Sequence, residues 1–340
     1  MEKQCRKVMV NKPWEISLET ETFNESIENP YEVIIRNKYS HISAGTEMAC
    51  ISDKEDWFTI PGTPGYTAVG EVLETGTEVE HVEKGDIVYT MGPHAEYFKI
   101  DTRDRWHGIC VKLPDNVNQE YASFTHMAGI AMTSIRKSNI ELGDYVLIAG
   151  LGVIGNLAAQ LAQLQGAEVI ALDIVEDRIK VAKECGIQNA INSQKQDPDG
   201  AIDKFTNGEG VSTFIDATGL SQVIEKYTNN IASYGEIILL GSPRDEYQSN
   251  LTDFLQKIHL LPTSATAKGA LEFTYPTHEN EFVKHSITRN SRIIMELIAD
   301  EKLVIAPFYT QKLDPSKAQS AYEGLRDNPN EYMGVVFDWT

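Results

Sequence analysis

Paired cysteines, which hold structural zinc ions and form redox motifs, are missing from this sequence. Among its 340 residues only Cys5, Cys50, Cys110 and Cys185 are cysteines, and none lies in a Cys-x-x-Cys pair. Such wide spacing excludes the common structural zinc motifs and the thioredoxin-like redox motif. The pattern predicts four reduced thiols in a reducing compartment.

Basic residues are also scarce. There are 30 lysines and arginines against 50 aspartates and glutamates, which gives a formal net charge of -20. Nucleic acids and anionic membrane surfaces attract basic proteins, so we expect neither as a partner. No apolar run approaches the roughly 20 residues that cross a bilayer, and no apolar signal core follows the first basic residues. We therefore predict a cytoplasmic protein with no membrane partner.

The length and the patterning predict two domains. A chain of 340 residues exceeds one ordinary core. The first 120 residues or so contain short β-branched segments separated by glycine and proline turns, which is typical of a mainly β domain. From residue 144 onward apolar strands alternate with helices, as in a parallel sheet covered by helices. We predict strands at 145–149, 168–172, 213–215 and 236–240, and helices at 120–135, 156–165, 178–184 and 221–232.

These elements predict an α/β protein. A mainly β domain would cover residues 1–125, and a doubly wound parallel sheet residues 126–267. The alternation ends in a polar segment near 260–285, after which we expect a helix at 291–300 and a strand at 333–337. The segment 268–340 would then return to the first domain.

A glycine motif at the start of the alternating region indicates a dinucleotide site. Gly150, Gly152 and Gly155 match G-x-G-x-x-G between a predicted strand and a predicted helix. The first glycine permits a tight turn, the second lets the backbone approach a pyrophosphate, and the third allows close packing of helix and strand. Val153 and Ile154 begin the helix, whose N-terminus favours phosphate. The alternative is a glycine turn that binds no dinucleotide.

An acidic residue favours NAD as the cofactor. Asp173 ends the next predicted strand, about 20 residues beyond the motif, where a carboxylate can bind the adenosine ribose. The same carboxylate would repel the 2′-phosphate of NADP. Ile174 follows it, and Arg178 either flanks the adenine or is a solvated helix residue. Further candidates at the carboxyl ends of later strands are Ala217, Thr218, Gly241 and Ser242.

On these residues the whole chain resembles the medium-chain dehydrogenase/reductase superfamily, in which a GroES-like domain precedes a Rossmann domain. The similar stretches are residues 44–47, 64–72, 95–97, 113–117 and 150–173. Residues 43–47 are similar to a subgroup that includes the bacteriochlorophyllide dehydrogenases. The resemblance implies a nicotinamide-dependent oxidoreductase and, by analogy alone, a homo-oligomer: relatives are commonly dimers or tetramers, and we expect a homodimer.

The departures from the family concern its zinc ligands. Zinc-dependent members have a cysteine at the position of Ala44, a histidine at that of Tyr66, and a third ligand near that of His126. Alanine has no donor atom, and a neutral tyrosine is a poor zinc ligand. The four-cysteine structural zinc loop is absent as well. The resemblance therefore implies a member with no metal.

Without a metal, a side chain must stabilise the charge that develops on a substrate oxygen, or the substrate must be of another kind. Our hypothesis is that Tyr66 or His126 hydrogen-bonds this oxygen, because tyrosine is a suitable donor and histidine titrates near neutral pH. Thr46 matches the hydroxyl that relays the proton in zinc-dependent members. Alternatively, Tyr66 fills the volume of the lost metal and His126 is a satisfied core histidine.

Three further residues complete the candidates. Glu47 lies in the same motif, and a structural hydrogen bond is its favoured role. His41 and His94 are expected in solvated loops. Polar candidates for the substrate pocket, namely Tyr39, Glu47, Tyr66 and His126, suit a hydroxylated substrate.

Three functions compete on this evidence. The first is an NAD(H)-dependent, zinc-independent oxidoreductase of a secondary alcohol or ketone, such as a polyol, sugar or cyclitol. The second is an NAD(P)H-dependent reductase of activated C=C bonds or quinones. The third is a non-catalytic NAD-binding protein.

Overall fold

The computed structural model describes residues 2–340 and divides into two compact units. Unit 1 contains residues 1–126 and 275–340, and unit 2 contains residues 127–274. The first division falls inside helix α3 (Thr125–Lys137). The predicted boundaries were 125/126 and 267/268. None of the helices in the described part of the chain combines the length and apolar character that crossing a membrane requires.

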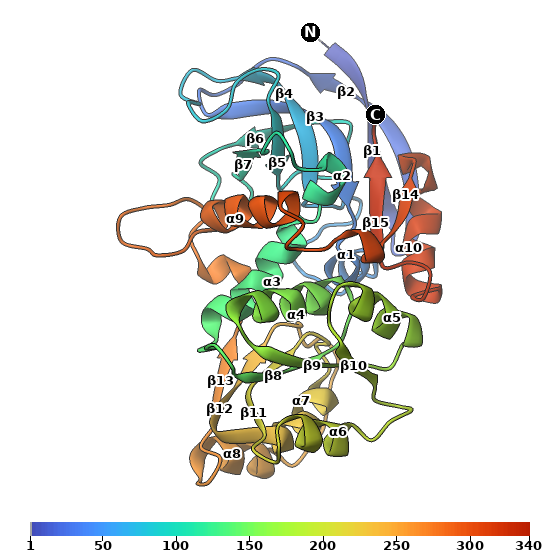
Figure 1. Ribbon diagram of the computed structural model, residues 1–340. Coiled ribbons are helices and arrows are strands. Elements are labelled where there is room, and N and C mark those ends of the chain that lie inside the picture. Colours follow the sequence, from blue (N-terminus) through green and yellow to red (C-terminus); the bar gives the residue numbers. More distant parts are fainter. Residues whose placement is uncertain (1) are drawn as a thin grey trace. The chain divides into compact units, whose positions relative to one another are not determined.

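Unit 1 is built around a seven-stranded sheet with the order β14-β15-β3-β4-β5-β7, in which β6 also pairs with β3. The blue strand β3 and the red strand β15 lie side by side although they come from opposite ends of the sequence (Figure 1). Its strands are β3 (Glu32–His41), β4 (Ala68–Thr75), β5 (Ile87–Thr90), β6 (Tyr97–Asp101), β7 (Cys110–Lys112), β14 (Tyr309–Leu313) and β15 (Gly334–Asp338).

Within the described residues, a hairpin, four α-helices, two short 3-10 helices and the start of α3 complete unit 1. The hairpin consists of β1 (Glu2–Lys12) and β2 (Glu15–Asn24), whose register pairs Val8 with Leu18. Val8, Ile42 and Phe337 belong to one buried apolar cluster, which fastens the hairpin to the sheet. The helices are α1 (Ala44–Ile51), α2 (Gln119–Ala122), α9 (Ile287–Ala299) and α10 (Ala318–Asp327).

Unit 2 is a six-stranded parallel sheet with the order β10-β9-β8-β11-β12-β13. Its strands are β8 (Tyr145–Ala149), β9 (Glu168–Asp173), β10 (Asn189–Asn192), β11 (Val211–Asp216), β12 (Ile231–Leu239) and β13 (Thr266–Gly269). The central strands are buried on both faces, which explains their apolar runs. This sheet and the GroES-like sheet of unit 1 confirm the predicted α/β fold class.

Helices cover both faces of the parallel sheet. Figure 1 shows α4 (Val153–Gln165) and α5 (Glu176–Glu184) on one side of it. On the other side lie α6 (Pro198–Phe205), α7 (Ser221–Tyr227) and α8 (Leu251–His259). Phe214 and Ile237 of the sheet share a buried cluster with Ile202 of α6 and Tyr227 at the end of α7. Helix α4 ends at Gly166, whose φ of 102° suits a glycine in the left-handed region.

Three predicted elements differ from the structure. The helix expected at 120–135 is broken at Ser123, whose hydroxyl bonds the carbonyl of Glu120, so that α2 and α3 are separate helices. The helix expected at 221–232 ends at Tyr227, and β12 already begins at Ile231. The alternation also continues beyond residue 260, because the partly polar strand β13 pairs with β12 at the sheet edge. An edge strand that is mostly exposed needs no apolar run.

Candidate active site

The glycine motif forms a tight turn between β8 and α4 in unit 2. Gly150 has a φ of 89°, a conformation that side chains disfavour. A Cβ atom on Gly155 would lie 1.8 Å from the carbonyl oxygen of Gly150, so only glycine permits this approach of helix and strand. A Cβ on Gly152 would meet no atom within 4 Å. The backbone at the N-terminus of α4 is therefore open to a ligand, and its first N–H groups lack helical partners.

Asp173 ends β9 beside this turn and is only 6% exposed. Its Oδ2 accepts a hydrogen bond from the N–H of Leu151, at 2.7 Å. Its Oδ1 accepts from the N–H groups of Ile174 and Val175, at 2.7 and 2.9 Å. Arg178 NH1 lies 3.7 Å from Oδ2. Since Oδ1 already has two donors, Oδ2 is the atom that can accept one further hydrogen bond from a ligand.

The loop after β11 meets the glycine turn, and the loop after β12 meets the loop after β11. Asp216, fully buried, accepts hydrogen bonds from the N–H and hydroxyl of Thr218 and from the N–H of Gly219. Burial nevertheless raises the pKa of Asp216. A Cβ on Gly150 would lie 2.9 Å from the Thr218 methyl, and a Cβ on Gly241 would lie 2.2 Å from the N of Gly219. A Cβ on Gly219 would lie 2.5 Å from the carbonyl oxygen of Ser242. Of the predicted cofactor residues, Ala217 and Thr218 therefore lie against the glycine turn, whereas Gly241 and Ser242 lie against the loop that carries Ala217 and Thr218.

A second group of polar residues lies in unit 1, around Tyr66. The Tyr66 hydroxyl donates a hydrogen bond to Ser43 Oγ and also interacts with the hydroxyl of Thr46. Its ring packs edge-on against that of His126, with the ring centroids 5.0 Å apart. Ala44 follows Ser43 directly, so Ala44, Tyr66 and His126, the positions at which the resemblance predicts the zinc ligands of other members, lie together. Tyr66, His126 and Thr46 were predicted from the sequence, whereas Ser43 was not assigned a role.

The protonation of this cluster follows from its burial. Burial and the nearby charge of Glu47 raise the pKa of Tyr66 above 10, although the hydroxyls of Ser43 and Thr46 act in the opposite direction. Tyr66 is therefore a neutral hydrogen-bond donor near neutral pH. Burial lowers the pKa of His126 from 6.5 to about 3. His126 is thus neutral too, and its Nδ1 lies 3.3 Å from the hydroxyl of Tyr89.

Glu47 lies beneath this cluster and is 1% exposed. Its Oε1 accepts a hydrogen bond from the N–H of Ser43, at 2.7 Å. Its Oε2 accepts from the Tyr322 hydroxyl at 2.5 Å and lies 3.0 Å from His94 Nε2. Tyr322 lies 275 residues further along the chain than Glu47, so no local sequence pattern could have paired them.

The expectation for His41 and His94 was wrong. His41 is the last residue of β3 and is 1% exposed, and His94 is 0% exposed. Turn-forming residues lie close to both histidines in the sequence, but segments that are distant in the sequence pack over the two side chains. Tyr39, named with the polar candidates, interacts with Asp338 and Glu120. Residues 2–340 hold no group of three or more His, Cys, Asp or Glu side chains placed to bind one metal ion.

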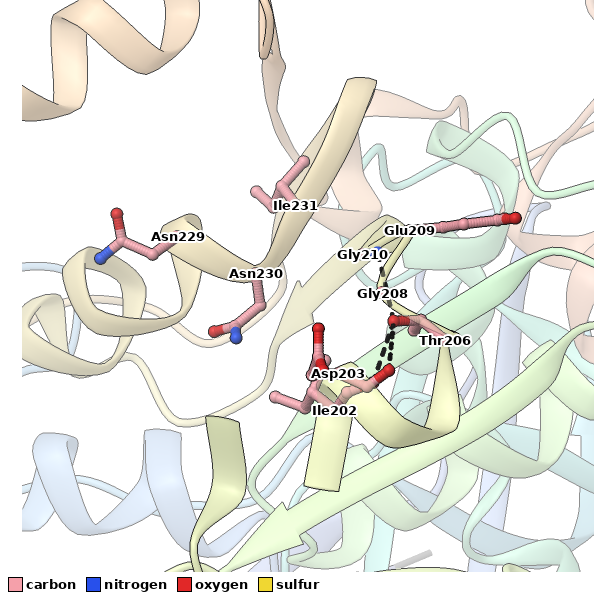
Figure 2. Close-up of a pocket in the computed structure, with 9 residues that line it drawn as sticks. All are labelled: Ile202, Asp203, Thr206, Gly208, Glu209, Gly210, Asn229, Asn230 and Ile231. Atoms are coloured by element: carbon pink, nitrogen blue, oxygen red, sulfur yellow. Dashed lines mark hydrogen bonds between the residues drawn. The ribbon is translucent and has the colours of Figure 1, made fainter. Parts of the chain in front are cut away.

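A hollow of about 180 Å³ lies elsewhere in unit 2, beside the end of α6 and the starts of β11 and β12 (Figure 2). Thr206, which lines it, donates to the carbonyl of Ile202 and accepts from the N–H of Gly210. The Thr206 hydroxyl is therefore used in hydrogen bonds to backbone groups of the residues around it. The hollow lies at the end of the parallel sheet where the strands begin, whereas the glycine turn lies at the opposite end, after the carboxyl end of β8. The two are therefore separate.

Two family models match the chain. The alcohol dehydrogenase GroES-like domain matches residues 29–151, and the zinc-binding dehydrogenase domain matches residues 153–280.

The relatives that are similar in sequence include dehydrogenases and reductases of small molecules. An uncharacterised zinc-type alcohol dehydrogenase-like protein from Haemophilus influenzae is 22% identical, over 98% of this chain and 99% of its own. D-xylulose reductase from Morganella morganii is 25% identical, over 77% of this chain and 80% of its own. D-guloside 3-dehydrogenase from Escherichia coli is 29% identical, over 51% of this chain and 49% of its own.

Solved structures share the fold over nearly the whole chain. Galactitol-1-phosphate dehydrogenase from Escherichia coli has a TM-score of 0.84 at 18% identity, covering 98% of this chain and 99% of its own. A quinone oxidoreductase from Pseudomonas syringae has a TM-score of 0.80 at 19% identity, covering 99% and 100%. A protein described as a zinc-binding dehydrogenase from Sinorhizobium meliloti, bound to NADP, has a TM-score of 0.79 at 19% identity, covering 99% of each chain.

The two family models account for nearly all of residues 29–280, and both units have the folds that these models describe. The chain therefore belongs to the medium-chain dehydrogenase/reductase superfamily of oxidoreductases.

Proposed function

We propose that this protein is an NAD(H)-dependent oxidoreductase of secondary alcohols and ketones, in which the hydroxyl of Tyr66 replaces a catalytic metal. The observation that carries the proposal is the cluster in which Tyr66 and His126, at two of the expected zinc-ligand positions, lie together with the hydroxyls of Ser43 and Thr46. A neutral tyrosine can donate a hydrogen bond to a substrate oxygen on which negative charge develops.

The residues present fit a dinucleotide. The open backbone at Gly152 and the N-terminus of α4 would hold the pyrophosphate, and Asp173 Oδ2 would accept one ribose hydroxyl. The buried carboxylate of Asp173 supports NAD over NADP, because a 2′-phosphate would place a second negative charge beside it. When bound, the nicotinamide supplies the hydride chemistry.

The residues present do not fit a catalytic zinc ion. Such a site needs three protein ligands, whereas Ala44 offers no donor atom and Tyr66 is held as a neutral phenol. Only the imidazole of His126 is a usual zinc ligand among these three positions. We therefore propose that the activity is independent of zinc.

In this proposal the chain's own hydroxyls handle the proton. When an alcohol is oxidised, its hydroxyl proton would pass to the Tyr66 oxygen as Tyr66 gives its own proton to the Ser43 and Thr46 hydroxyls, which pass a proton on to solvent. When a ketone is reduced, the transfers would run in reverse: Tyr66 gives its proton to the substrate oxygen and regains one through Ser43 and Thr46. Thr46 is partly exposed, which gives this relay an outlet to solvent. His126 packs against the Tyr66 ring and holds it in place, as a neutral group.

The substrate class rests on the relatives and on the polarity of the site. Three similar proteins are named for xylulose, a guloside and galactitol phosphate, all of which carry several hydroxyl groups. We propose a polyol, sugar or cyclitol as the substrate, oxidised at a secondary hydroxyl.

The test is nicotinamide absorbance with panels of substrates, run with and without a chelator. We expect NAD reduction by a polyol or sugar, insensitive to the chelator and faster than NADP reduction. Tyr66→Phe should lower kcat about 100- to 1,000-fold, because it removes one donor to the developing charge. Tyr234→Phe, at a tyrosine of unit 2 that is 72% exposed, is the matched control and should leave turnover unchanged. Full turnover in Tyr66→Phe would refute the role of this hydroxyl.

The same assay decides between the alternatives. A hydroxyl donor can also polarise the carbonyl of an enone or quinone, so we retain reduction of activated C=C bonds or quinones as the second candidate. NADH- or NADPH-dependent reduction of enones alone would favour that candidate. Tight NADH binding without any turnover would favour a non-catalytic NAD-binding protein.

A further inference from the structure

A buried chain of hydrogen bonds leads from Trp339 to Glu47 through unit 1. The Trp339 Nε1–H donates to Ser40 Oγ at 2.9 Å. Ser40 Oγ lies 2.8 Å from His94 Nδ1, and His94 Nε2 lies 3.0 Å from Glu47 Oε2. All four side chains are nearly inaccessible, from 0% exposure for Ser40 and His94 to 4% for Trp339. A chain that is sealed from solvent cannot attack a substrate, so its role must be exerted through its neighbours.

The donors and acceptors fix one tautomer of His94. Both carboxyl oxygens of Glu47 already act as acceptors, Oε1 for the N–H of Ser43 and Oε2 for the hydroxyl of Tyr322, so His94 Nε2 faces an acceptor and carries the proton. The indole of Trp339 can only donate, so it uses one lone pair of Ser40 Oγ and leaves the serine hydroxyl to donate to His94 Nδ1. In this arrangement each donor among the side chains of Trp339, Ser40 and His94 has an acceptor. A doubly protonated His94 would leave the hydroxyl of Ser40 without an acceptor.

His94 is connected to the Tyr66 cluster in two ways, indirectly through Glu47 and directly at Gly65. Through Glu47 it reaches the N–H of Ser43, whose hydroxyl accepts from Tyr66. More directly, it packs against Gly65, the residue before Tyr66: a Cβ there would lie 2.7 Å from His94 Cγ. The backbone N–H of His94 also donates a hydrogen bond to the carbonyl of Pro64, at 2.9 Å.

The position of the His94 ring is itself fixed. Phe337 packs edge-on against it, with the ring centroids 5.0 Å apart. Ser40 belongs to β3, and Phe337 belongs to the neighbouring strand β15 of the same sheet. The ring is therefore held by the sheet and by two hydrogen bonds, while it contacts both segments that carry the Tyr66 hydroxyl and its acceptor.

We propose that His94 is a positioning residue, which as its Nε2–H tautomer fixes Glu47 and the Gly65 turn and thereby aims the Tyr66 hydroxyl at the substrate oxygen. This inference rests on the proposed function of Tyr66. Glu47 transmits the effect by holding the Ser43 backbone at the start of α1, and Ser40 and Trp339 select the tautomer.

The variants separate hydrogen bonding from packing. His94→Phe keeps a ring against Phe337 and Gly65 but removes both hydrogen bonds. His94→Gln retains an N–H donor that can reach Glu47. Ser40→Ala removes only the hydroxyl that bonds Nδ1. We expect kcat to fall about 10- to 100-fold in His94→Phe with little change in KM, and to recover at least partly in His94→Gln. The affinity for NADH, bound by unit 2, should stay the same in all three variants.

Two NMR readouts need no turnover and distinguish this inference from the proposed function. Long-range proton–nitrogen correlation spectra should show the proton of His94 on Nε2 in the wild-type chain. The phenolic carbon resonance of Tyr66, assigned by its loss in Tyr66→Phe, should shift in His94→Phe and return toward the wild-type value in His94→Gln. If no substrate is turned over, the proposed function fails, and these spectra still report whether His94 positions Tyr66.

Several outcomes would overturn the inference. One is a proton on Nδ1 of His94 in the wild-type chain. Another is a folded His94→Phe with an unmoved Tyr66 resonance or with wild-type kcat, because a merely structural histidine would lower stability alone. If His94→Phe does not fold, Ser40→Ala decides, since it must shift the Tyr66 resonance in the same direction by a smaller amount.

Discussion

His41 ends β3 with its imidazole ring against that of Phe124, the ring centroids being 4.2 Å apart. It is 1% exposed, and neither of its ring nitrogens has a hydrogen-bond partner among residues 2–340. Burial, followed by the charges of His94 and His126 when protonated, lowers the pKa of His41 from 6.5 to about 3. The folded protein therefore excludes a proton that the unfolded chain binds readily in mildly acidic solution.

This difference predicts how stability depends on pH. Because the folded pKa lies below the unfolded one, the stability that neutral His41 provides is present above about pH 6.5 and is lost as the pH falls toward about 3. Between these two pH values, the proton that His41 binds only in the unfolded chain lowers the free energy of unfolding by up to about 1.4 kcal/mol for each unit by which the pH falls. We expect His41→Leu to make the free energy of unfolding in urea depend less steeply on pH. The pH dependence that remains would come in part from His126, whose pKa is lowered in the same way.

A neighbouring substitution serves as the control. Ile42→Val removes one methyl group from a fully buried side chain and should cost about 1 kcal/mol at every pH without changing the slope. An unchanged slope in His41→Leu would show that this imidazole titrates alike in both states.

At the scale of single elements, the start of α4 is the least tolerant of change. Gly155→Ala would place a methyl group 1.8 Å from the carbonyl oxygen of Gly150, and this oxygen belongs to the backbone and cannot swing aside. The helix would have to move away from the turn that we propose to hold the pyrophosphate. We expect NADH to bind at least about 10-fold more weakly and the unfolding free energy to fall by about 1–3 kcal/mol.

Gly269→Ala is the matched control, because a Cβ at that position of the same unit meets no atom within 4 Å. Titration of NADH fluorescence and urea unfolding measure the two effects. Wild-type affinity in Gly155→Ala would argue against a cofactor site at this turn.

At the scale of the whole molecule, the family analogy led us to propose a homodimer, and unit 2 offers surfaces for one. Strand β13 lies at the end of the parallel sheet with only β12 beside it. The nearby helix α8 exposes Leu251 (61%) and Leu255 (52%). An open sheet edge and exposed leucines both favour association with another chain.

We expect sedimentation to give twice the chain mass of 37.9 kDa at micromolar concentration. Leu251→Lys combined with Leu255→Lys should shift the equilibrium toward the monomer, whereas Leu164→Lys, at an exposed leucine of α4, should not. A wild-type chain that sediments as a monomer throughout this range would contradict the homodimer.

The sequence by itself determined the features that depend on local chemistry. The tight turn at the glycine motif, the strand before it and the position of Asp173 at the end of the next strand could be predicted, because such a turn requires glycine and a buried strand requires an apolar run. The binding of a ribose by Asp173 stays a prediction. The strand predicted at 145–149 coincides with β8, since burial on both faces demands a continuous apolar run. The absence of a donor atom at Ala44 was likewise evident from the residue type alone.

Only the tertiary structure decided the environment of the buried polar residues. Glu47 meets Tyr322 and His94, and Ser40 meets Trp339, across separations that no local pattern records. Whether a histidine near a turn is solvated or enclosed depends on which distant segments pack over it. The pKa values of His41 and His126 and the orientation of the Tyr66 hydroxyl therefore follow from the folded chain, because burial and charge act through space rather than along the sequence.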